Sequence, residues 1–314
     1  MNSKAQMFTM FAISILILLF VSYSVYTLAQ DRKAIKIRVT TMDSFLSSIE
    51  QDLERQLYIY GFRSLIIAED YVSTKGEYIP DVNEFFNLTF YNETVYEKNY
   101  TELISGANYP YILSKINKAS SKINVEILLT DINISVAQED PWHVVVIFQA
   151  NLTMRDKAGL AYWNKTEVIK SYIPIEGFGE PVYIVKTKSF LLDKSKINKT
   201  LYDGNYNSAG DRSNLTSHVI YGLYAENPDA PSYLQRLEGK ISDSSPNGIE
   251  RLLYIPDLSL YEDQGVQVFD GKSVVDHVYF SSGFTGGSQI SGTGIPAGWS
   301  WFIIDSNHDD EKYT

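Results

Sequence analysis

The sequence contains no cysteine among its 314 residues, and this absence excludes several kinds of structure and chemistry. No disulfide can cross-link the fold, no thiolate can hold zinc, and no thiol can serve as a nucleophile. Positive charge is also scarce, because 27 lysines and arginines face 38 aspartates and glutamates, a formal net charge of −11. Nucleic-acid binding needs a basic stripe that pairs with phosphates, so we exclude nucleic acid as a partner.

Motifs for catalysis are missing as well. The four histidines, at positions 143, 218, 277 and 308, are not spaced as H-E-x-x-H or as another recognisable metal-binding motif. The sequence has no G-x-S-x-G elbow, and Gly271-Lys272-Ser273 lacks the earlier glycine of a phosphate-binding loop. We therefore predict no catalytic residue, no metal ligand and no cofactor. We expect His143 and His277, which lie in strand-like patterns, to be structural.

Two segments near the C-terminus match ligand-binding sequences in part. The segment Asp305–Glu311 opens like a calcium-binding loop, with oxygen ligands at alternate positions, but Asp310 stands where that loop requires glycine. We predict a solvated acidic end instead. Trp299 and Trp301 could stack on sugars, but alternate aromatic residues on a strand are more typical of a core.

A long uncharged run marks the N-terminal region, since no charged residue occurs between Lys4 and Asp31. Residues 7–28 are predominantly apolar, and about 20 apolar residues in a helix span the ~30 Å hydrocarbon core of a membrane. A cleavable signal peptide would have a shorter apolar stretch followed by small residues, a pattern that residues 29–33 do not provide. We predict a transmembrane helix over residues 6–30.

Apolar residues continue beyond this run at steps of three and four, the pattern of one face of a helix. No proline occurs before Pro80, and Gly61 is the single glycine before residue 76. We predict one continuous helix over residues 7–72, with an amphipathic extension of the membrane helix at 31–75. Its apolar stripe comprises Val39, Met42, Leu46, Ile49, Leu53, Leu57, Tyr60, Ser64, Ile67 and Tyr71.

The residues just before the apolar run, Lys4-Ala5-Gln6-Met7, place a basic and a small residue directly against it. Together with the helix that follows, they resemble the class III signal of archaeal type IV pilin-like proteins. The resemblance implies a leader peptide at residues 1–5, removed by a prepilin-type peptidase between Ala5 and Gln6. It further implies self-association through the N-terminal helix with the help of assembly machinery.

The resemblance covers the leader, the helix and its amphipathic extension, and it has departures. Ala5 replaces the commoner glycine, and Met10 stands where bacterial relatives carry glutamate. The chain is also large for a main filament subunit, which favours a minor, tip or adhesive role.

Eight Asn-x-Ser/Thr sequons follow the helix, and none has proline in the middle position. N-glycans are carried on extracellular surfaces, so the sequons favour an outside location for the region after the helix. A positive-inside count gives the opposite orientation, because residues 32–38 are rich in lysine and arginine, but we give the sequons more weight. The sequons lie at Asn87, Asn92, Asn99, Asn133, Asn151, Asn164, Asn198 and Asn214.

Three of the sequons lie in strand-like segments whose alternation predicts a solvated face. The apolar residues Leu128, Ile132, Ile134 and Val136 lie at even positions, as do those from Val144 to Met154, which leaves Asn133 and Asn151 on the opposite face. In the next strand, apolar residues at odd positions leave Asn164 facing outward. We predict that the three asparagines project from one face of one sheet.

The remaining pattern predicts an α+β protein: a long N-terminal transmembrane and amphipathic helix followed by an antiparallel β-rich ectodomain. We divide the ectodomain into an antiparallel β domain at 76–192, a linker at 193–216 and a second β-rich region at 217–314. An exposed loop is expected at 76–99 and short helices at 100–122 and 233–237. Strands are expected near 124–137, 143–155, 160–173, 182–190, 249–255, 266–269, 273–280 and 299–304.

These predictions favour a non-enzymatic, pilin-like, single-pass membrane protein of the cell surface, acting in filament assembly or adhesion. Complete lack of cysteine is typical of archaeal or Gram-positive surface proteins. The alternative is a signal-anchored extracellular enzyme of a hydrolase-like kind, whose substrate and catalytic carboxylates the sequence does not indicate. A chain beginning near Tyr78 is expected to be soluble and monomeric, because the net negative charge lies mainly in the ectodomain.

Overall fold

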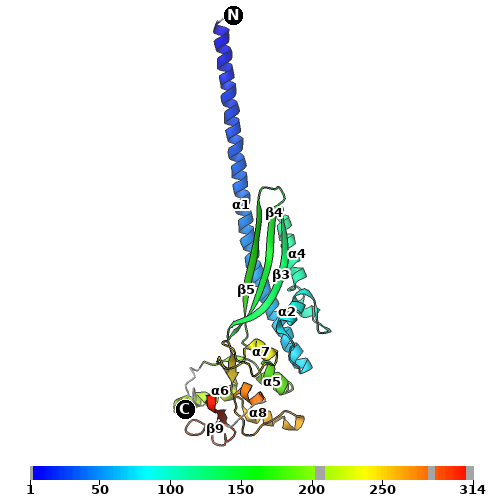
Figure 1. The fold of residues 1–314 in the computed structure, drawn as a ribbon, viewed down its shortest axis with the longest axis vertical. Coiled ribbons are helices and arrows are strands. Elements are labelled where there is room, and N and C mark those ends of the chain that lie inside the picture. The colour runs from blue at the N-terminus through cyan, green and yellow to red at the C-terminus, as the bar shows by residue number, and fades with distance from the viewer. Residues whose placement is uncertain (1–2, 202–208, 282–286, 309–314) are drawn as a thin grey trace. The chain divides into compact units, whose positions relative to one another are not determined.

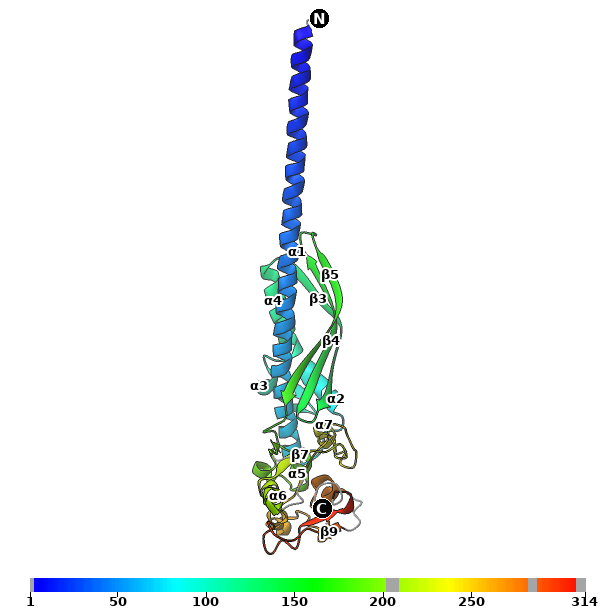
Figure 2. The same cartoon turned by 90° about the vertical axis from the view of Figure 1, so that its left-hand side faces the viewer.

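The structure is a computed structural model that describes residues 3–201, 209–281 and 287–308, shown as ribbons in Figures 1 and 2. It has the expected α+β class, with a long apolar N-terminal helix followed by antiparallel sheets. The chain divides into two compact units, and each combines segments that are far apart in sequence. Unit 1 comprises Met1–Leu53, Leu113–Asp131 and Ala150–Glu167; unit 2 comprises Glu54–Ile112, Ile132–Gln149 and Val168–Thr314.

Helix α1 runs without a break from Ser3 to Lys75, so the predicted continuous helix is confirmed. Of the ten residues in the predicted stripe, nine are buried, and Val39 is 38% exposed. Before Met42 the helix buries no side chain among its described residues 6–41. The helix is therefore covered along one face only from Met42 onward.

In unit 1, ion pairs as well as apolar contacts hold α1 in place where its buried face begins. The Arg38 guanidinium donates to Asp156 at 2.7 Å and to the carbonyl oxygen of Ile123 at 2.7 Å. Its hydrogen bond to Asp156 lowers the pKa of that buried carboxyl. Farther along the helix, Lys165 lies 2.6 Å from both Glu50 and Glu167. These ion pairs fix the rotation of the helix at the point where its apolar stripe begins.

A three-stranded sheet in the order β3-β4-β5 contributes strand segments to both units. Its strands are β3 (Val125–Asp140), β4 (His143–Asp156) and β5 (Tyr162–Pro174), so the three long predicted strands are confirmed. The predicted choice of inward-facing positions in β3 is wrong in the first part of the strand. Val125, Ile127 and Leu129 are buried at odd positions, whereas Leu128, expected inside, is 56% exposed.

The alternation in β3 changes phase at Asp131, after which Ile134 and Val136 are buried at even positions as predicted. Asp131 has φ +51°, in the left-handed region that one extra residue in a strand adopts at a β-bulge. The bulge explains why simple alternation fails before Asp131 and succeeds after it.

In unit 2, the segment expected to be an exposed loop at 76–99 contains helix α2 (Val82–Tyr91). Asp81 caps it by accepting a hydrogen bond from the amide of Glu84 at 2.8 Å. Its buried residues recur at helical spacing, and Tyr60 of α1 donates to the carbonyl oxygen of Phe86. We had interpreted the many sequons in this segment as a sign of an exposed loop, and so missed an amphipathic helix. The short strands β1 (Thr94–Val95) and β2 (Lys98–Asn99) follow, and then α3 (Thr101–Ile104) and α4 (Tyr109–Lys122) confirm the predicted helices.

Gly61 lets α1 pack closely against the sheet within unit 2. A Cβ atom at this position would lie 2.7 Å from both Ile173 Cδ1 and Val146 Cγ2. Glycine therefore serves helix–sheet packing here, and the helix continues through it.

The rest of unit 2 is built from short elements around one apolar core that includes Leu215, Leu253, Tyr279 and Phe302. Strand β7 pairs in parallel with β6 and antiparallel with β8, and β9 pairs antiparallel with β10. The elements are α5 (Pro181–Lys186), η1 (Leu192–Lys194), β6 (Asn198–Lys199), α6 (Ala209–Tyr221), β7 (Leu223–Glu226), α7 (Tyr233–Leu237), β8 (Ile249–Arg251), α8 (Ile255–Ser259), η2 (Glu262–Gln264), α9 (Asp276–Phe280), β9 (Gly287–Gln289), β10 (Ile303–Asp305) and α10 (Ser306–His308).

Several short elements here differ from the prediction. The helix predicted at 233–237 is confirmed by α7, with Ser232 in a capping box. The strand predicted at 182–190 is wrong, because Glu180 and Pro181 start helix α5. The strand predicted at 273–280 is wrong as well, since 276–280 form α9, and no described residue of 266–269 is in a strand. Near 299–304, only Ile303 and Ile304 belong to a strand, β10. The segment proposed as a linker carries η1, β6 and the start of α6.

Candidate functional site

The first candidate surface is the apolar part of α1 that unit 1 leaves uncovered. Leu16 is 69% and Phe20 70% exposed, and no residue of the most apolar stretch is buried. The helix is long and apolar enough to cross a membrane, and it is near the N-terminus. An exposed apolar surface of this length needs a partner, either lipid or other helices. The predicted cleavage residues Ala5 and Gln6 lie in the first turns of this helix.

The eight sequon asparagines all lie in described segments, and none is buried. Asn87 is the most restricted, because its Nδ2 donates to the carbonyl oxygens of Asn83 and Ile134 at 2.9 and 3.1 Å. Asn151 Nδ2 donates to Asp131 at 2.7 Å. Asn133, Asn151 and Asn164 each lie opposite the buried phase of their strand segment, as the sequence predicted. Glycosylation of the eight sites stays a prediction.

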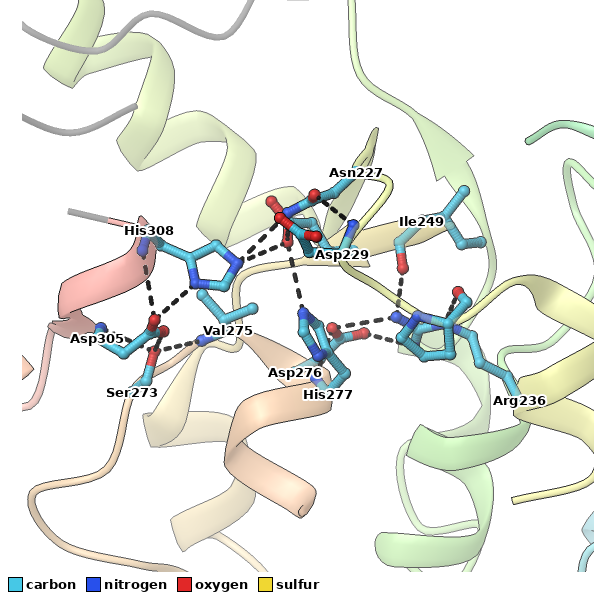
Figure 3. Close-up of polar contacts among 12 residues, drawn as sticks. Asn227, Asp229, Arg236, Ile249, Ser273, Val275, Asp276, His277, Asp305 and His308 are labelled. Carbon is cyan, nitrogen blue, oxygen red and sulfur yellow. Dashed lines mark hydrogen bonds and ion pairs between the residues drawn. The ribbon is translucent and has the colours of Figure 1, made fainter. Parts of the chain in front are cut away.

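The second candidate is a cluster of three buried side chains in unit 2, namely Glu250, His277 and His308 (the two histidines are labelled in Figure 3). They come from β8, α9 and α10, and their nearest ligand atoms all lie within 4.8 Å of one another. Glu250 Oε2 is 3.1 Å from His308 Nε2 and 3.6 Å from His277 Nε2. The three residues are 2%, 9% and 6% exposed. Sequence spacing could not reveal this cluster, because its members are each about 30 residues apart.

His308 is held on its other side by a carboxylate. Its Nδ1 lies 2.7 Å from Asp305 Oδ1, and the second oxygen of Asp305 accepts from the Ser273 hydroxyl at 2.7 Å. Burial alone would lower the pKa of His308, but the hydrogen bonds to Asp305 and Glu250 raise this pKa to about 10. The expectation of a solvated acidic end is therefore wrong for Asp305 and His308, which are buried; residues 309–311 lie outside the described part of the chain.

Asn227 is a further polar neighbour of Glu250 and His308. Its Nδ2 donates to Glu250 Oε2 at 2.6 Å and lies 3.4 Å from His308 Nε2. His277 differs from its neighbours, because its Nε2 is buried and makes no hydrogen bond with any described residue.

Beside the cluster lies a buried ion network centred on Arg236 of α7. The guanidinium donates to Asp276 at 2.7 Å and to Glu180 at 3.1 Å, and it also donates to the carbonyl oxygen of Ile249. Burial raises the pKa of Glu180, and the charge of Arg236 opposes this effect. The network fixes Ile249 and Asp276, the sequence neighbours of Glu250 and His277, and so positions two members of the cluster.

The other two histidines lie apart from this cluster. His143, at the start of β4, is 2.9 Å from Asp140, with its side chain 42% exposed. His218 is buried in α6.

No family model, curated protein or solved structure matches this chain.

Proposed function

We propose that the protein is a membrane-anchored, type IV pilin-like subunit of the cell surface, which acts in filament assembly or adhesion. The observation that carries the proposal is the contrast along α1: residues 7–28 are apolar and uncovered, whereas from Met42 onward the helix packs against its own chain. Such a helix is inserted in a bilayer before assembly and bundled with other helices after it. Both environments suit a segment whose apolar residues occur on all sides.

Removal of a basic leader fits this role. Cleavage between Ala5 and Gln6 by a prepilin-type peptidase would leave the whole apolar helix on the mature protein and delete Lys4. Mass spectrometry of the N-terminal peptide from protein purified out of host membranes tests this step. We expect Gln6 as the first residue. A mature protein that starts at Met1 or after Ala29 would contradict the pilin-like function.

Assembly through the helix has a second test. The full chain should form bundles or filaments as detergent is removed, because its uncovered apolar residues otherwise have no suitable environment. Leu16→Asp should abolish both membrane retention and assembly, since a carboxylate at the bilayer centre costs about 2.5–3.5 kcal/mol. Leu16→Ile is the matched control and should behave as the wild type. Wild-type protein that stays monomeric in membranes at every concentration would contradict assembly.

A non-enzymatic role is part of the proposal. A cell-surface enzyme would need reactive groups that a substrate can reach, whereas Glu250, His277 and His308 are buried side chains. Hydrolysis of ester, peptide and glycoside test substrates by the purified full chain, lost in Glu250→Gln, would favour the enzyme over the pilin-like subunit.

A further inference from the structure

We propose that Glu250, His277 and His308 bind one divalent transition-metal ion of the zinc class, which clamps the C-terminal segment to the core of unit 2. This site is independent of the proposed assembly function, because it lies in unit 2 and uses no residue of α1.

The geometry of the ligand atoms supports a metal. Bonds of about 2.0–2.2 Å to nitrogen and oxygen in a tetrahedral site place neighbouring ligand atoms roughly 3.3 Å apart. The two separations from Glu250 Oε2, 3.1 Å to His308 and 3.6 Å to His277, lie on either side of that value. The third separation is no more than 4.8 Å, so a small rotation of one imidazole ring closes the triangle.

His277 supplies the second, independent observation. Buried polar atoms are nearly always hydrogen-bonded, and leaving one unpaired costs about 1–3 kcal/mol. His308 and Glu250 are satisfied by Asp305, Asn227 and each other, but His277 Nε2, which lies 3.6 Å from Glu250 Oε2, makes no hydrogen bond with a described residue. A metal ion among the three residues provides the missing partner.

The surroundings of His308 match those of a metal-binding histidine. Such a residue usually donates its second ring nitrogen to a carboxylate, which fixes the ring orientation and increases ligand basicity. Asp305 occupies this position at 2.7 Å, and Ser273 in turn holds Asp305. The arrangement presents Nε2, rather than Nδ1, to Glu250, and a metal ion bound there would displace to solvent the proton that Nε2 shares with Glu250.

The ligand types select the metal. Calcium and magnesium prefer oxygen ligands, whereas two imidazoles and one carboxylate are a set that zinc and its neighbours bind well. Three protein ligands leave one tetrahedral position for water or another ligand. Because a chain without cysteine cannot form disulfides, a metal that joins β8, α9 and α10 provides a cross-link by other means.

Cobalt substitution tests the site directly. Full-length protein without a histidine tag is purified in detergent, treated with EDTA and titrated with Co²⁺, followed by visible absorption and then by competition with Zn²⁺. We expect one Co²⁺ per chain, displaced by Zn²⁺, and an increase in Tm on addition of Zn²⁺. Folded, EDTA-treated wild-type protein that shows neither absorption bands nor an increase in Tm overturns the proposal.

Variants identify the ligands. His277→Gln should weaken Co²⁺ binding by more than about 10-fold, since loss of an outer partner alone costs 10–100-fold. Asp305→Asn should weaken it within that 10–100-fold range. His143→Gln, which changes an exposed histidine of β4, is the matched control and should bind as the wild type. Wild-type affinity in folded His277→Gln overturns the assignment. If His277→Gln does not fold, the wild-type titration and Asp305→Asn decide.

Discussion

The two parts of helix α1 have similar secondary structure and very different surroundings. Residues 7–28 are apolar on every side and exposed, whereas from Met42 to Tyr71 the apolar residues form one stripe and are buried. Between them, Arg38 binds Asp156 at the first point where the helix contacts the rest of unit 1 through a charged side chain. The distribution of apolar residues around the helix, rather than their number, decides which part packs against its own chain.

Removal of residues from the N-terminus should separate the two parts most clearly. A chain that begins at Asp31 should lose the membrane attachment that we propose and keep the fold of the remaining residues, because the buried stripe begins later, at Met42. A chain that begins at Tyr78 should fail to fold, since it lacks buried residues such as Tyr60 and Val72. This replaces our expectation from the sequence that the shorter chain is a soluble monomer. Circular dichroism and gel filtration of the two chains measure the difference.

A leucine-to-alanine substitution should have a large effect on stability in the buried part of α1 and almost none in the exposed part. Leu57→Ala removes a fully buried side chain and should lower the free energy of unfolding by about 2–5 kcal/mol. Leu16→Ala, in the exposed part, should leave it unchanged within about 0.5 kcal/mol. Urea unfolding of the full chain in detergent, followed by tryptophan fluorescence, measures both values. Equal losses in the two variants would contradict the division of the helix.

A substitution at Gly61 tests how closely α1 approaches the sheet in unit 2. Gly61→Leu must displace Ile173 and Val146, and overpacking of this kind costs about 1–3 kcal/mol. Ser48→Leu, at an exposed position of the same helix, should cost less than about 0.5 kcal/mol. The same unfolding measurement applies, and a neutral Gly61→Leu would show that the helix can move away from the sheet.

The smallest expected effect is a change with pH in the stability that the Arg38–Asp156 ion pair contributes. Because the hydrogen bond from Arg38 lowers the pKa of Asp156 from its ordinary 3.8, the ionised carboxylate stabilises the folded state above that pH. The stabilisation is lost as the pH falls through the lower pKa of the folded state. Asp156→Asn should therefore be less stable than the wild type at pH 7, and the difference should shrink below about pH 4. A difference that is constant from pH 7 to pH 2 would contradict the ion pair.

Periodic patterns in the sequence predicted the long elements well. The stripe of α1 was correct at nine of ten residues, because a helix with no proline and one glycine keeps its 3.6-residue period over many turns. The long strands β3, β4 and β5 were predicted from the alternation of apolar and polar residues, although in β3 the predicted phase holds only after Asp131. By contrast, α5 and α9 are too short for periodicity to separate them from strands. For α5 the better signal was Glu180, which caps the helix, followed by Pro181 at its first position.

The buried cluster could not have been predicted from one sequence. Glu250, His277 and His308 follow no motif, and a core of many short elements brings them together. A weak signal did exist in Asp305-Ser-Asn-His308, which we interpreted as an acidic loop. The histidine three residues after an aspartate, at helical spacing, was the informative feature.

The bulge at Asp131 has a consequence for folding fidelity. A strand with uninterrupted alternation can pair with its neighbour two residues out of register and still bury one apolar face. In β3 the buried phase changes at Asp131, so a slip by two residues would place the change opposite the wrong partner and expose apolar side chains. The correct pairing is thus distinguished from its nearest misfolded alternatives. This safeguard matters in a chain that has no cysteine with which to lock the native register covalently.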